Sequence, residues 1–176
     1  LLGFPPEDFN EEAKASIRRL MRADQPTNRA IALCAVANMR DQIPRLRELA
    51  ARPPTGARAW WTSPAWYARL ALARMGSKED IEYCIRMVES EPDARLRLGR
   101  LLHHLGYIRQ PEVIPVLQRY LESEQEIPGD DDVLPTNYSG RAAEVLARVL
   151  EGFPARPTGA STLPPSEAKG CRKWMK

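Results

Sequence analysis

The sequence predicts an all-α fold, an α-solenoid in which about four helical hairpins stack with a right-handed superhelical twist and no strand. The first observation behind this prediction is a leucine pattern within residues 92–122. Leu98, Leu101, Leu102 and Leu105 fall there at i, i+3, i+4 and i+7, which is the spacing of one helix face. The second observation is that the same spacing recurs after Pro111, at Val113, Val116, Leu117, Tyr120 and Leu121. Because proline suits the first turn of a helix, this stretch indicates one helix, a short turn and a second helix.

The third observation is that three other predicted helices repeat the leucine register. All twelve matching positions are apolar: Ala32, Ala35, Val36 and Met39; Ala68, Ala71, Leu72 and Met75; Ala142, Val145, Leu146 and Val149. The alternate helices start at Ile43, Ile81 and Val113, which lie 38 (81 − 43) and 32 (113 − 81) residues apart. These distances are close to the unit length of helical-pair solenoids, so residues 11–152 are predicted to form one solenoid domain.

Start and stop signals place the individual helices. The predicted helices are, in order, residues 11–23, 28–40, 41–52, 65–75, 77–89, the two helices of residues 92–122, and residues 137–151. Asn10 can cap the first helix, and Ser63 followed by Pro64 is a cap and first-turn pair for the fourth. Gly76 and Gly106 are predicted to end the helices that precede them.

The remaining segments read as connections. Residues 1–10 form a proline-containing lead-in, and residues 123–136 form an acidic insertion that interrupts the helical pattern. Residues 153–166 have the composition of a proline-rich linker, and residues 167–176 start a terminal helix or tail.

Beyond its periodicity, the chain resembles the HEAT-repeat family, including the short bacterial members, over residues 11–152. The residues that carry the resemblance are Ala94-Arg95 at the start of a second helix, Leu105-Gly106 at its end, and Pro-Glu-Val-Ile-Pro-Val-Leu over residues 111–117. Asp24 and Arg29 look like the acidic turn and stacking arginine of that family, whereas Ala65 and Ser139 stand where further arginines would be expected. The resemblance implies a curved scaffold whose concave face holds another macromolecule.

Composition excludes several classes. The 26 Lys and Arg residues against 23 Asp and Glu residues give a formal charge of only +3, too mild to indicate a nucleic-acid binder without a concentrated basic surface. Three cysteines, an odd number without a Cys-x-x-Cys pair, fit buried free thiols better than a disulfide framework or a zinc site. The uncharged apolar stretch of residues 30–39 is shorter than the ~20 residues of a membrane span, so none is predicted.

Candidate chemical sites are few. His103 and His104 point about 100° apart on a helix and have no third ligand at i+3 or i+4, so no metal is predicted there. Glu126 with residues 130–132 offers carboxylates without the alternation of a calcium loop, which indicates a solvated acidic loop. No serine or cysteine has a catalytic flanking motif. No cofactor and no catalytic residue are predicted.

An aromatic group stands out beside the fourth helix. Trp60, Trp61 and Trp66 are three of the four tryptophans, and they fall within seven positions next to Tyr67. They either fill the core or offer an aromatic contact to a partner.

A polar stripe lies opposite the leucines, and the family resemblance places it on the concave side. Its members in the central helix are Arg97, Arg100 and His104, and the same offsets elsewhere give Ile31, Cys34 and Asn38, then Tyr67, Leu70 and Arg74, then Arg141, Glu144 and Arg148. The predicted partner-binding residues are Tyr67, Arg74, Arg97, Arg100, His104, Arg141 and Arg148. Acidic residues concentrate instead in residues 122–132, so the stripe suits an acidic or phosphate-bearing protein or peptide. The other interpretation is that these arginines are solvated or pair within the chain.

Two function classes remain. The first is a non-catalytic protein–protein interaction scaffold. The second is a HEAT-like enzyme acting on nucleic acid, such as an alkylpurine DNA glycosylase, which needs a catalytic carboxylate on a basic concave face. Glu144 is the only acid on the stripe, and Arg141 and Arg148 at i−3 and i+4 predict that it is paired. We therefore favour the scaffold.

Overall fold

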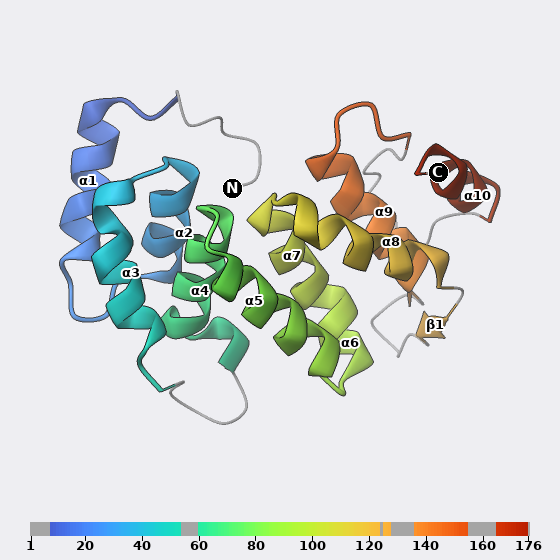
Figure 1. Ribbon diagram of the computed structural model, residues 1–176, viewed down its shortest axis with the longest axis horizontal. Helices are drawn as coiled ribbons and strands as arrows, with labels where there is room; N and C mark the ends of the chain where they lie inside the picture. The colour runs from blue at the N-terminus through green and yellow to red at the C-terminus, as the bar shows by residue number, and fades with distance from the viewer. Residues whose placement is uncertain (1–7, 54–59, 124, 128–135, 155–164, 176) are drawn as a thin grey trace. The chain divides into compact units, whose positions relative to one another are not determined.

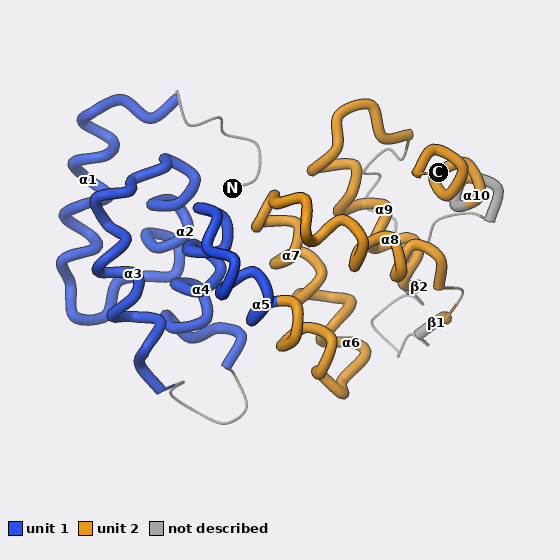
Figure 2. Tube along the Cα trace, viewed as in Figure 1, with its two compact units in different colours: residues 1–84 blue, residues 85–176 orange. Residues whose placement is uncertain are grey.

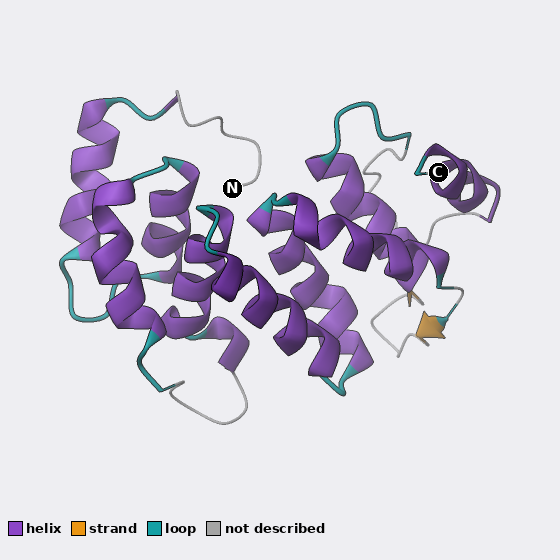
Figure 3. Cartoon of the chain, viewed as in Figure 1, coloured by secondary structure: helices purple, strands orange, loops and turns teal. Residues whose placement is uncertain are grey.

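The fold is all-α, as predicted. The computed structural model describes residues 8–53, 60–123, 125–127, 136–154 and 165–175, and helices make up 76% of these residues (Figures 1 and 3). The α-helices are α1 (Glu11–Met21), α2 (Asn28–Val36), α3 (Ile43–Ala50), α4 (Pro64–Arg74), α5 (Lys78–Ser90), α6 (Ala94–Leu96), α7 (Leu102–Ile108), α8 (Ile114–Glu122), α9 (Tyr138–Val149) and α10 (Pro165–Trp174). Short 3-10 helices are η2 (Arg40–Gln42), η3 (Trp60–Thr62) and η5 (Pro111–Val113), and η4 (Arg97–Leu101) is a π-helical turn.

The chain divides into two compact units, residues 1–84 and residues 85–176 (Figure 2). In unit 1, α1 packs against α2, and α4 packs against both α2 and α3. Helix α2 is buried on nearly every side, because six of its nine residues are alanine, isoleucine, cysteine or valine side chains closed off from solvent. Small side chains of this kind let neighbouring helices approach closely.

The predicted starts of two helices in unit 1 are confirmed. The Asn10 side chain accepts a hydrogen bond from the Ala13 N–H (2.8 Å), and the Ser63 hydroxyl accepts one from the Trp66 N–H (3.2 Å). Each bond satisfies a backbone donor that the first turn of a helix leaves without an intrahelical partner. Pro64 follows Ser63 at the first helical position, where its missing N–H costs nothing.

Unit 2 contains the central leucine helix and the three helices that follow it. Segments α6, η4 and α7 form one continuous helix over residues 94–108. The four leucines that define the register, Leu98, Leu101, Leu102 and Leu105, are fully buried in it. Helix α9 packs against α7 and α8, and α10 packs against α8 and α9. Across both units, fourteen of the sixteen register positions are buried, with Met75 and Val149 half-buried. The register therefore identifies core positions correctly.

Gly106 does not end a helix, contrary to the prediction. Helix α7 continues to Ile108 and stops at Arg109, which takes the left-handed conformation (φ 54°). Gly106 is buried within α7, and a Cβ atom there would lie 2.4 Å from Cγ1 of Val145 on α9. The glycine is needed because α9 packs too closely to leave room for a side chain.

Three further predictions need correction. Helix α2 ends at Val36 instead of residue 40, because Asn38 adopts a left-handed conformation (φ 51°) and the chain then forms η2. The fold was also expected to contain no strand. Instead, β1 (Glu126–Ile127) and β2 (Thr136–Asn137) form a two-residue antiparallel pair at the two ends of the acidic insertion. The α2 part of the polar stripe is not exposed, because Ile31 is buried in the core, whereas the burial of Cys34 agrees with the predicted buried thiols.

Several predicted segments lie outside the described residues. They are residues 1–7 of the lead-in, residues 54–59 after α3, most of the acidic insertion with Asp130, Asp131 and Asp132, and residues 155–164 of the linker. Within the described residues, no helix is both long and apolar enough to cross a membrane. The HEAT resemblance and the solenoid arrangement remain predictions.

Candidate functional site

The predicted partner-binding residues are shared between the two units. Tyr67 and Arg74 lie on α4 of unit 1, whereas Arg97 and Arg100 on η4, His104 on α7, and Arg141 and Arg148 on α9 belong to unit 2. Arg100 and Arg148 are exposed, and the other five side chains are half-buried.

Arg97 is committed to contacts inside unit 2. Its Nε and one Nη donate hydrogen bonds to the Tyr138 hydroxyl (3.0 and 2.6 Å), and its other Nη donates to the Glu91 carbonyl (2.8 Å). Tyr138 is buried and stacks on the ring of Tyr120, with 5.2 Å between centroids. These bonds join the start of the leucine helix to α9, so Arg97 holds the two helices together.

Two stripe residues on α9 flank Glu144 as predicted. Arg141 donates to one carboxylate oxygen of Glu144 (2.6 Å), and Arg148 donates to the other (2.5 Å). The carboxylate is 13% exposed, so both bonds form in a partly desolvated place where charge-assisted hydrogen bonds are stronger than in water. Glu144 thereby fixes the orientation of two guanidinium groups.

Two residues at α7 complete a surface that we call the basic cluster: His103, Arg109, Arg141, Glu144 and Arg148. Arg141 lies 3.2 Å from Nε2 of His103, and because a guanidinium can only donate, this nitrogen accepts and His103 is neutral. Burial is the main cause that lowers the pKa of His103, with Arg141 and Arg148 acting in the same direction against Glu144. Arg109 donates to the Arg148 carbonyl (3.2 Å).

The basic cluster has an excess of positive charge. Two guanidinium groups, those of Arg141 and Arg148, share the carboxylate of Glu144, which leaves a local charge of +1 in this set of three with His103 neutral. Nε of Arg141 is buried and has no hydrogen-bond partner among the described residues. Arg148 is 40% exposed on its side chain, and its other N–H groups have no partner in the described part of the chain.

The adjacent histidines do not assemble into a metal site in the part of the chain that the structure describes. No group of three or more histidine, cysteine or acidic side chains there could hold a metal ion. His103 is used by Arg141, whereas burial, followed by His103 and Arg100, lowers the pKa of His104 to about 4.

The tryptophans of the aromatic group in unit 1 differ in burial. Trp66 is buried and meets Trp60 edge to face, with 4.8 Å between ring centroids, so Trp66 fills the core. Trp60 and Trp61 lie in η3 and are half-buried. Their contact with a partner remains a prediction.

Unit 1 also contains a charge cluster that sequence reasoning missed. Glu48 on α3 accepts hydrogen bonds from Arg45 (2.6 Å) and Arg52 (3.0 Å), at the same i−3 and i+4 positions as the arginines around Glu144. The repeated signal, Arg-x-x-Glu-x-x-x-Arg, is visible in the sequence at residues 45–52 and 141–148. In unit 1 the two arginines also donate to backbone carbonyls of Met21, Ala23 and Asp24 at the end of α1 and the turn after it.

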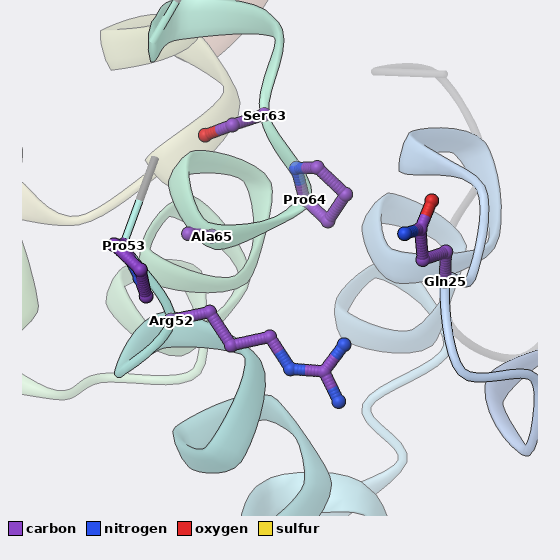
Figure 4. A pocket seen from close by; sticks show the side chains of 6 residues that line it. All are labelled: Gln25, Arg52, Pro53, Ser63, Pro64 and Ala65. Atoms are coloured by element: carbon purple, nitrogen blue, oxygen red, sulfur yellow. The ribbon is translucent and has the colours of Figure 1, made fainter. Parts of the chain in front are cut away.

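Two hollows open on unit 1. A shallow groove of about 380 Å³ is lined by Arg47, Ala50, Ala51, Arg69, Leu72, Ser77, Glu79 and Asp80. Within it the buried carboxylate of Asp80 accepts from Arg69 (2.8 Å) and Ser77 (2.6 Å). A smaller pocket of about 80 Å³ is lined by Gln25, Arg52, Pro53, Ser63, Pro64 and Ala65 (Figure 4).

The chain matches no family model, no curated protein and no solved structure. The assignment of a function therefore rests on the geometry and charge of these surfaces.

Proposed function

We propose that the protein is a non-catalytic interaction scaffold and that the basic cluster of unit 2 binds an acidic segment of a partner protein. The observation that supports this proposal is that Arg141 and Arg148 share the one carboxylate of Glu144, with Arg109 beside them on the Arg148 carbonyl. A partner carboxylate or phosphate there would neutralise the excess charge of Arg141 and Arg148 over Glu144.

The arrangement of the arginines favours recognition of anions. A guanidinium presents a rigid fork of donors that matches the two oxygens of a carboxylate or phosphate. Glu144 orients Arg141 and Arg148, so less side-chain entropy is lost when a partner binds. Arg148 is exposed, and its remaining donors are open to a partner.

This proposal gives Glu144 a structural role. In the alternative, an enzyme acting on nucleic acid, Glu144 would be the catalytic carboxylate of the stripe. Each of its two oxygens accepts a hydrogen bond from an arginine, and the carboxylate is only 13% exposed. A carboxylate whose two oxygens are both paired with arginines serves to orient those arginines. This role of Glu144 supports a binding function over a catalytic one.

Fluorescence anisotropy with labelled poly-L-glutamate and labelled duplex DNA tests the proposal. We expect poly-L-glutamate to bind, more weakly as salt rises from about 50 to about 200 mM because the charges lie at the surface. Arg148→Glu should weaken this binding about tenfold or more, equivalent to about 1.4 kcal/mol. The matched control is Arg40→Glu, which makes the same charge change at an exposed arginine in unit 1.

The two possible failures are distinct. Equal weakening by Arg148→Glu and Arg40→Glu would mean that net charge, and not the basic cluster, governs binding. Binding of duplex DNA without binding of poly-L-glutamate, together with loss of a base-excision activity in Glu144→Gln, would establish the enzyme alternative.

A further inference from the structure

The small pocket of unit 1 has apolar walls and a polar rim. Pro53, Pro64 and Ala65 supply the walls, while Arg52 and Gln25 place a guanidinium and an amide at its edge (Figure 4). Its volume of about 80 Å³ is several times the roughly 10–15 Å³ that one water needs, so the end of a side chain can enter it.

Arg52 is held in place and still has donors to offer. One Nη donates to the Asp24 carbonyl (2.7 Å) and the other donates to Glu48 (3.0 Å), so two of its five N–H groups are used. Arg45 binds the same carboxylate, which leaves a local excess of one positive charge in this set of three. The fixed guanidinium can therefore donate to a second carboxylate.

Gln25 is the second polar group at the rim. Its side chain is exposed, and it has no hydrogen bond to any described residue. Ser63, in contrast, donates to the Trp60 carbonyl (2.7 Å) and accepts from the Trp66 N–H. Its hydroxyl is therefore already used to cap the start of α4. Recognition in this pocket therefore falls to Arg52 and Gln25.

We propose that this pocket receives the side chain of a glutamate or aspartate from a partner protein. The methylene groups would lie against the two proline rings and Ala65, and the carboxylate would meet the guanidinium of Arg52 and the amide N–H of Gln25. Apolar walls with a few convergent polar groups are typical of sites that bind one defined group. The site lies in unit 1 and does not depend on the basic cluster of unit 2.

Nuclear magnetic resonance titration tests the proposal with small probes. The first probe is N-acetylglutamate α-amide, whose only carboxylate is on the side chain, and its neutral counterpart is N-acetylglutamine α-amide. We expect the first probe alone to shift the Gln25 side-chain amide and Arg52 Nε–H signals in a saturable way. Arg52→Gln should weaken binding about tenfold or more, because it removes the charged fork.

Two other variants keep the test decisive if Arg52→Gln fails to fold. Ala65→Leu should abolish binding by filling the pocket, and Gln25→Ala should weaken it, with far-UV circular dichroism unchanged. Arg47→Gln is the matched control, because Arg47 lies on α3, five residues before Arg52, and does not line this pocket.

Three results would overturn the proposal. They are equal binding of the neutral probe, unchanged binding in Ala65→Leu, and tighter binding of N-acetylalanine, which carries only a terminal carboxylate. Variants of the basic cluster, such as Arg148→Glu, should leave this titration unchanged, so the two proposals fail separately.

Discussion

Replacing Gly106 with alanine is a direct test of how closely α7 and α9 pack. The new methyl group would stand 2.4 Å from Cγ1 of Val145, whereas carbon atoms in contact lie about 3.5–4.0 Å apart. Val145 is only 1% exposed, and a β-branched side chain in a helix has one strongly preferred rotamer. The clash can therefore be relieved only if Val145 leaves its preferred rotamer or the two helices separate.

The expected cost combines two opposite effects. Overpacking a core costs about 1–3 kcal/mol, and a contact as short as this one belongs to the upper part of that range. Alanine in place of glycine within a helix returns about 1 kcal/mol. We expect a net destabilisation of about 1–2 kcal/mol for Gly106→Ala, measured as the free energy of unfolding in urea.

Gly99 provides the control for helix propensity. It lies in the same continuous helix and is exposed, and apart from its chain neighbours and its own helix backbone no heavy atom would lie within 4 Å of an added Cβ. Gly99→Ala should stabilise the chain by up to about 1 kcal/mol. The difference between the two substitutions isolates the clash, at about 2–3 kcal/mol.

A double-mutant cycle identifies the partner of the clash. Val145→Ala removes the offending methyl group, so Gly106→Ala should cost much less in that background, with a coupling of about 1–2 kcal/mol. If Gly106→Ala instead stabilises the chain as much as Gly99→Ala does, the close approach of α7 to α9 is wrong.

Three other predictions follow from the described contacts. The pKa of His104 is lowered to about 4 in the folded chain. Below about pH 6.5 His104 therefore binds a proton in the unfolded chain but stays neutral in the folded chain until the pH approaches 4. Stability should therefore fall as the pH drops from about 6.5 to 4, with His104 contributing up to about 3 kcal/mol. His104→Gln should reduce the difference in stability between about pH 7 and pH 5 in urea unfolding, and the lowered pKa of His103 accounts for part of what remains. All three cysteines are buried and free, and burial raises the pKa of Cys34 to about 12. A thiol reagent should therefore label them slowly in the native chain, whereas labelling in denaturant should detect three free thiols. Fewer than three would reveal a disulfide. Tyr138→Phe removes the acceptor of two Arg97 hydrogen bonds and should cost about 1.5–3 kcal/mol, whereas a loss below about 0.5 kcal/mol would show that Arg97 does not hold the helices together.

The sequence by itself determined the features that depend on near neighbours in the chain. Helix caps such as Asn10 and Ser63 act over three residues, and the apolar register of the leucine helix repeats over three and four. The bridge from Glu144 to Arg141 and Arg148 is predictable for the same reason, since an α-helix brings i−3 and i+4 side chains together whatever surrounds it. The same pattern around Glu48 was equally readable, although its arginines lie outside the polar stripe.

The tertiary structure decided which of these features meet across the fold. A glycine near a helix end is compatible with a stop signal or with a close helix contact, and only the position of Val145, 39 residues later (145 − 106), identifies Gly106 as a contact. Arg97 has the spacing of a surface stripe, yet its acceptor on Tyr138 lies 41 residues away. The pocket of unit 1 is likewise lined by residues from three separate parts of the chain, 25, 52–53 and 63–65. Such partners are set by the packing of whole helices, and the local pattern of side chains does not encode the distances between them.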